Sequence, residues 1–97
     1  MILSWFNANE AKDFGAALAN FYIEKLPPDT PTKKNQEKKQ QDVINKMLLQ
    51  ISQFKRNNKL NTYKKAQLGN TFKWTLKNAG YPPTLINALT TQLMLHL

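Results

Sequence analysis

The sequence predicts an all-α fold, either a small four-helix bundle or an irregular helical array. In four segments, apolar residues recur at steps of three and four, which is the spacing of one helix face. No segment shows the sustained alternation of apolar and polar residues that is typical of a half-buried strand. Proline or glycine stands at two of the three junctions, where helices tend to end. A chain of 97 residues has enough material for one modest core, so we expect a single helical domain over residues 1–97.

The first helix is expected at residues 8–26. Asn7 is suited to cap it, and Glu10 follows three residues later, which is the spacing of a capping box. The small residues of the segment GAALA, at 15–19, would let another helix approach closely. A proline pair ends the helix. Its apolar stripe comprises Ala11, Phe14, Leu18, Phe21, Tyr22 and Leu26.

Residues 27–32 form a proline-rich linker, and the second helix is expected at 32–58. Residues 33–42, with the sequence KKNQEKKQQD, contain no apolar anchor. They are predicted to be a polar, lysine-rich helix extension or arm. The buried face lies in the second half of the helix and comprises Val43, Ile44, Met47, Leu48, Ile51 and Phe54.

The third helix is expected at residues 62–79. Asn61 is suited to cap its start, and Gly80 stands where a left-handed residue commonly ends a helix. The predicted core side carries Leu68, Phe72, Leu76 and Ala79, together with Gly69.

The fourth helix is expected at residues 83–96, after a second proline pair. Its apolar face comprises Ile86, Leu89, Leu93 and Leu97. Leu85, Met94 and Leu95 fall outside this stripe, which leaves apolar material for a partner or a second layer of core.

The charge is strongly positive, with 14 Lys plus Arg against 6 Asp plus Glu and a net charge of +8. Such a field attracts phosphate backbones, anionic lipid or acidic proteins without choosing among them. Thirteen of the cations are lysines and the chain has eleven asparagines, so the composition of a codon-biased genome is an alternative explanation. The candidate contacts to nucleic acid or another anion lie in the second helix and just before it: Lys33, Lys34, Lys38, Lys39, Lys46 and Arg56.

No set of residues in the sequence points to catalysis. The chain has no cysteine, a single histidine at position 96 and three isolated glycines, so no thiolate nucleophile, histidine-based metal cluster or glycine-rich phosphate loop is indicated. We therefore expect a non-enzymatic protein without cofactor, metal or small-molecule site. The sequence also indicates no signal peptide and no transmembrane segment, which favours a cytoplasmic location.

The leading functional hypothesis is a protein-interaction or self-association module, with a homodimer as one form of it. Its candidate recognition surface lies on the side of the third helix opposite the core and comprises Tyr63, Gln67, Asn70, Trp74 and Lys77. An alternative gives Trp74 a structural role, covered by the first helix or by the segment that contains Trp5 and Phe6. The functional alternative is a nucleic-acid accessory protein that binds the phosphate backbone non-specifically through the lysine-rich second helix.

Overall fold

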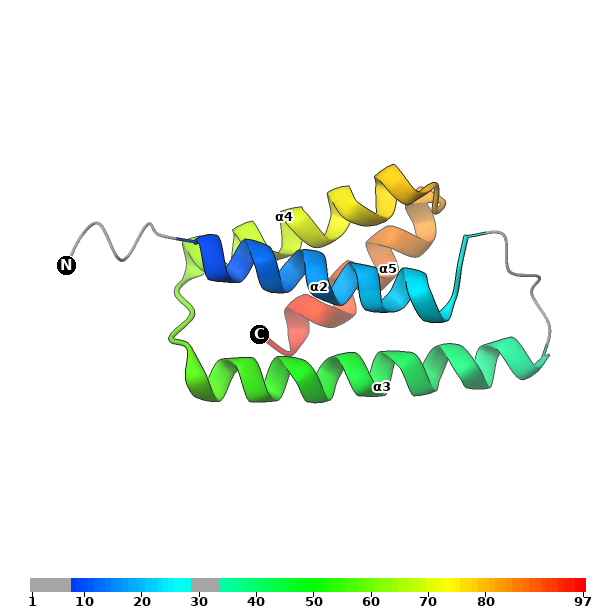
Figure 1. The fold of residues 1–97 in the computed structure, drawn as a ribbon, viewed down its shortest axis with the longest axis horizontal. Coiled ribbons are helices and arrows are strands. Elements are labelled where there is room, and N and C mark those ends of the chain that lie inside the picture. The colour runs from blue at the N-terminus through cyan, green and yellow to red at the C-terminus, as the bar shows by residue number, and fades with distance from the viewer. Residues whose placement is uncertain (1–7, 29–33) are drawn as a thin grey trace.

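A computed structural model describes residues 8–28 and 34–97, and Figure 1 shows their arrangement. These residues form four helices and no strand: α2 (Asn9–Lys25), α3 (Lys34–Asn57), α4 (Thr62–Ala79) and α5 (Pro83–Leu95). The all-α prediction is confirmed, and each helix begins and ends within two residues of its predicted bounds. Among the helices of these two ranges, none is both long and apolar enough to cross a bilayer.

Local signals in the sequence explain where α4 begins and ends. The side chain of Asn61 accepts a hydrogen bond from the backbone N–H of Lys64 at 2.8 Å, as a helix cap does. Gly80 has a φ of 99°, and its N–H bonds to the carbonyls of the last turn. Both predicted end signals of α4 are thus confirmed. At the start of α2, Asn7 lies outside the described residues.

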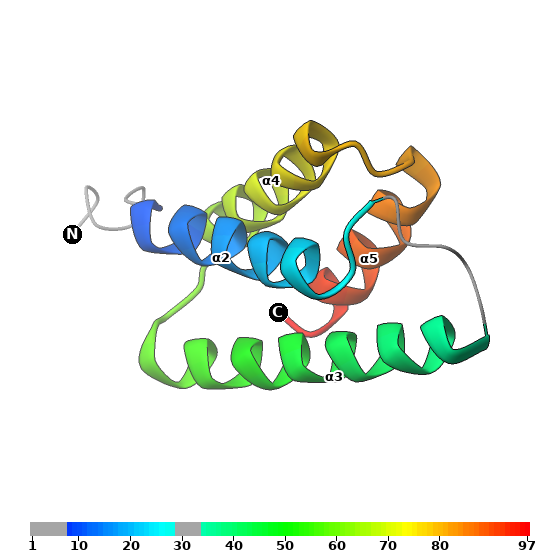
Figure 2. The same cartoon turned by 45° about the vertical axis from the view of Figure 1, so that its right-hand side comes forward.

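The helices α2 and α4 pack side by side with very close backbones. Gly15 permits this approach, because a Cβ atom added there would lie 2.5 Å from the carbonyl oxygen of Leu68. Figure 2 shows the two helices adjacent, with α5 folding back beneath α4. The prediction that the small residues at 15–19 admit a neighbouring helix is confirmed.

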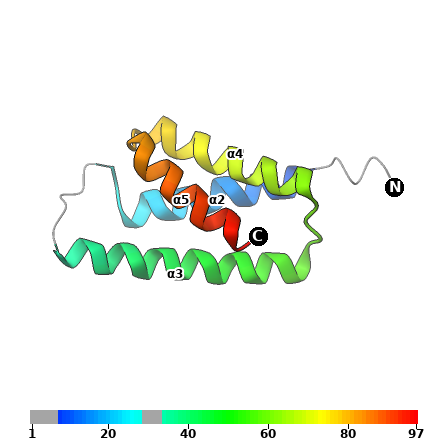
Figure 3. The same cartoon turned by 180° about the vertical axis from the view of Figure 1, so that it is seen from behind.

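The long helix α3 packs on α2 and α5, on the side away from α4. In Figures 1 and 3 it runs along one side of the molecule, with α4 along the other. The rings of Phe14 and Phe54 stack with centroids 4.1 Å apart, and the amide of Gln40 donates a hydrogen bond to the Tyr22 hydroxyl at 3.1 Å. These contacts hold α3 against α2 near both ends of α3. Residues 34–42 form the first turns of α3.

The core follows the predicted stripes. Phe72 is 0% exposed at the centre of α4, and it is the largest of the fully buried side chains. Leu48, Phe54 and Leu97 are half-buried at the edge of the core. Both predicted outliers at the end of α5 are exposed, Leu95 by 80% and Met94 by 37%. The other buried positions from the predicted stripes comprise Ala11, Leu18, Tyr22, Leu26, Val43, Ile44, Met47, Ile51, Leu68, Leu76, Ile86, Leu89 and Leu93.

Candidate functional site

Trp74 is exposed on the outer side of α4. Its side chain is 58% accessible, whereas Phe72, two residues earlier, is fully buried. The helix α2 packs against the backbone of α4 at Leu68. Because the Trp74 ring is exposed, the alternative in which the first helix covers it is wrong. The other form of that alternative involves Trp5 and Phe6, which lie outside the described residues. Tryptophan is enriched in the energetic centres of protein interfaces, which makes this position the starting point of the site.

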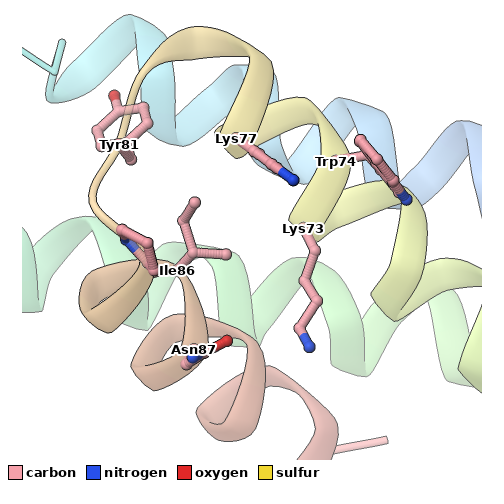
Figure 4. Close-up of a pocket in the computed structure, with 7 residues that line it drawn as sticks. Lys73, Trp74, Lys77, Tyr81, Ile86 and Asn87 are labelled. Carbon is pink, nitrogen blue, oxygen red and sulfur yellow. The ribbon is translucent and has the colours of Figure 1, made fainter.

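A surface pocket lies next to Trp74, between the last two turns of α4 and the first turn of α5. Its volume is about 300 Å³. Figure 4 shows side chains from both helices around the hollow, with Ile86 directed into it from α5. We call this feature the α4–α5 pocket; its lining residues are Lys73, Trp74, Lys77, Tyr81, Pro83, Ile86 and Asn87.

The sharp turn between α4 and α5 creates this pocket. After Gly80 the chain places Tyr81 in the core, at 6% exposure, with its ring edge-on to Tyr22 and 5.6 Å from it. The Tyr81 hydroxyl donates a hydrogen bond to the backbone carbonyl of Leu26. Because this polar end is bonded inside the protein, the pocket wall beside Tyr81 is the apolar ring. The two prolines that follow then start α5 beside the end of α4.

Two lysines form the rim of the pocket on the α4 side. Lys73 and Lys77 are both exposed and lie one helical turn apart. The ammonium of Lys77 stands 4.8 Å from the centre of the Trp74 ring, a cation–π contact that holds this cation next to the pocket. Within the part of the chain that the structure describes, neither lysine has a carboxylate partner.

The charged side chains that line the pocket, Lys73 and Lys77, have one sign. The last acidic side chain of the sequence is Asp42, and residues 43–97 contain eight cations and no Asp or Glu. Residues 1–42 contain six cations and six acids, so the whole net charge of +8 belongs to the segment that forms most of α3 and all of α4 and α5. The pocket is thus an apolar hollow whose rim carries two positive charges, in a protein of net charge +8.

The structure divides the recognition surface predicted on the third helix. Trp74 and Lys77 line the α4–α5 pocket, and Asn70 is exposed one turn before Trp74. Tyr63 and Gln67 are half-buried, and Tyr63 packs against the core. These two residues lie three and two turns away from Trp74 on α4, and their part in the candidate recognition surface stays a prediction.

Sequence reasoning missed most of the pocket. Lys73, Tyr81 and Ile86 come from different faces or elements, and only the turn at Gly80 brings them together. The stripe analysis placed Ile86 in the core, where it is indeed 6% exposed, but it also forms a wall of the pocket. The absence of acids beyond Asp42 is a signal in the sequence that could have directed attention to this end of the chain.

The lysine-rich candidates lie on the solvent side of α3. Lys38, Lys39, Lys46 and Arg56 are exposed. Lys34 belongs to the first turn of α3, and Lys33 lies outside the described residues. Lys38 and Arg56 are five full turns apart and therefore share one line along the helix, about 27 Å apart.

No group of three potential metal ligands occurs within residues 8–28 and 34–97. Tyr22 is a titratable residue of the core, outside the lining of the pocket. Burial raises the pKa of the Tyr22 hydroxyl above its usual value, and the hydrogen bond from Gln40 offsets part of this rise.

Comparisons of the chain with protein-family models, with curated proteins and with solved structures found no match.

Proposed function

We propose that this protein is a non-enzymatic interaction module that binds a protein partner at the α4–α5 pocket and the adjoining Trp74 ring. The observation that carries the proposal is the 58% exposure of Trp74 beside an apolar pocket of about 300 Å³. Tryptophan is among the residues most enriched in the energetic centres of protein interfaces. Covering the ring and the pocket together would remove apolar surface from water, which favours association.

The chemistry of the pocket supports binding. Its lining combines two lysines and one amide with apolar and aromatic groups, and it includes no carboxylate, imidazole or thiol. Small sets of polar groups around an apolar hollow are typical of recognition sites, where the hollow supplies affinity and the polar groups supply orientation. In this pocket the polar groups that would orient a partner belong to Lys73, Lys77 and Asn87.

Site-specific photo-crosslinking in cells of the source organism tests the proposal. A photoreactive amino acid is placed at Asn87, which lines the pocket, and in a matched control at Ala17, which is exposed on α2. We expect a discrete crosslinked protein from position 87 only, and its loss when Trp74→Ala is added. A product of twice the mass of this chain would identify a second copy as the partner. Equal crosslinking from both positions, or crosslinking that survives Trp74→Ala, would contradict the proposal.

A second candidate function is non-specific binding of a nucleic-acid backbone along α3. It is supported by the exposure of Lys38, Lys39, Lys46 and Arg56 on this helix. Counterion release predicts that such binding is strong at low salt and falls steeply at physiological salt, with little dependence on base sequence. Gel-shift titrations with duplex DNA at two salt concentrations check this, and a triple Lys38→Gln, Lys39→Gln, Lys46→Gln variant should bind less. Absence of a shift at low salt would exclude it.

A further inference from the structure

We infer that the partner presents an acidic segment, which inserts one bulky apolar side chain into the α4–α5 pocket and places its carboxylates against Lys73 and Lys77. The inference rests on the proposed function and names the chemistry of the partner. It draws on three features of the structure: the sign of the charge, the polarity of the pocket wall and the size of the pocket.

Charge complementarity selects an anionic partner. Lys73 and Lys77 are like charges spaced by four residues on one helix, a pairing that destabilises the free helix slightly. No acid of α4 or α5 is present to compensate them, because residues 43–97 contain none. A carboxylate bound between the two ammonium groups would relieve their repulsion, whereas a cationic segment would add to it.

The pocket wall selects an apolar side chain rather than a nucleobase. Tyr81 contributes its ring while its hydroxyl is bonded to Leu26, and the side chains of Ile86 and Pro83 consist of carbon atoms only. Asn87 is the single amide among the lining residues. A base inserted here would bury several polar edge atoms with too few partners, which costs free energy, whereas a phenylalanine or leucine side chain would bury none.

The dimensions favour one anchor. A volume of about 300 Å³ lies at the small end of the range found for ligand sites. The pocket therefore suits a single aromatic or branched side chain. The contact of the Lys77 ammonium with the Trp74 ring, at 4.8 Å, holds one cation at the rim before the partner arrives. Because the Lys77 side chain is already ordered, less conformational entropy is lost when a carboxylate binds it.

Fluorescence titration of the full chain tests the inference. The chain has two tryptophans, so Trp5→Phe leaves Trp74 as the only reporter. Four probes are compared at low and physiological salt. They are a capped pentapeptide Glu-Asp-Phe-Asp-Glu, its amide analogue Gln-Asn-Phe-Asn-Gln, its anchor-less analogue Glu-Asp-Ala-Asp-Glu, and a short oligothymidylate.

We expect the acidic phenylalanine peptide to shift the Trp74 emission to the blue and to bind about tenfold or more tightly than either analogue, because each analogue lacks one of the two recognised features. A Lys73→Gln, Lys77→Gln variant should lose this preference for the acidic peptide over its amide analogue. The matched control Lys39→Gln, Lys46→Gln removes the same charge from the exposed side of α3 and should keep the preference.

The outcomes separate the inference from the proposed function. Equal binding of the acidic and amide phenylalanine peptides would overturn the acidic partner but leave a protein-binding pocket. Equal binding of the phenylalanine and alanine peptides would overturn the apolar anchor. A response to oligothymidylate alone would overturn both the inference and the protein-interaction function, and a lack of response to every probe would overturn the inference.

Discussion

The backbone at Leu68 leaves no room for a side chain at Gly15. A Cβ atom built on Gly15 would lie 2.5 Å from the Leu68 carbonyl oxygen, and the obstacle is backbone rather than a movable side chain. The close approach of α2 to α4 at this point therefore requires glycine. The helix α4 therefore carries both this close contact and, further along, Trp74 and the two lysines of the pocket rim.

Gly15→Ala should destabilise the protein, although alanine is the better helix former by about 1 kcal/mol. Separating α2 from α4 to admit the methyl group should cost about 1–3 kcal/mol, as overpacked cores do. Urea unfolding followed by circular dichroism measures the change. Gly69→Ala is the matched control: its Cβ would meet the flexible Met94 side chain at 2.9 Å from the sulfur, so its stability should change less. Equal stability of the two variants would refute the assigned contact.

Phe72→Ala should lower the free energy of unfolding by about 3–5 kcal/mol, because it empties the centre of the core. Phe72 is 0% exposed and is the largest side chain at that level of burial. Lys38→Ala, on the exposed side of α3, should change the free energy of unfolding by less than about 0.5 kcal/mol. Denaturant titrations that give the two variants equal stability would contradict the assignment of helix faces.

The stability of the protein should fall at high pH because of Tyr22. Since burial raises the pKa of this hydroxyl in the folded state, the unfolded state releases the proton first, and ionisation then favours unfolding. The contribution of protonated Tyr22 to stability is fully present below its pKa in the unfolded state, about 10. This contribution is lost as the pH rises through the higher pKa of Tyr22 in the folded state. Unfolding midpoints measured across this window should decline less in Tyr22→Phe. An identical decline in the variant would show that Tyr22 does not contribute.

Much of the fold was predictable because short-range signals decide it. The proline pairs, the cap at Asn61 and the left-handed Gly80 act within a few residues, and the apolar stripes identify the buried faces. The α4–α5 pocket was not expected, because it depends on the angle at which α5 returns beside α4 and on the Tyr81 hydroxyl reaching Leu26 across the chain. Helix periodicity describes one helix at a time and cannot supply such a relationship.

Trp74→Ala should leave the fold intact. The ring is 58% exposed, and the interaction lost within the chain is the cation–π contact with Lys77, so the free energy of unfolding should change by less than about 1 kcal/mol. Urea unfolding measures this change, with Phe72→Ala as the destabilised reference. Loss of cooperative unfolding in Trp74→Ala would mean that Trp74 supports the core.

Amide NMR of the labelled protein, titrated with the acidic phenylalanine peptide, tests most directly whether the α4–α5 pocket is a recognition site. We predict that the largest shifts occur at the Trp74 indole, the Asn87 side-chain amide and the backbone between residues 73 and 87, while Lys38 and Lys46 on α3 remain unchanged. The first group of positions lies at or next to the pocket, whereas Lys38 and Lys46 lie on α3. The pattern of shifts therefore distinguishes binding at the pocket from general attraction to the positive charge. Shifts concentrated on α3, or no shifts at peptide concentrations that saturate the fluorescence response, would contradict the account.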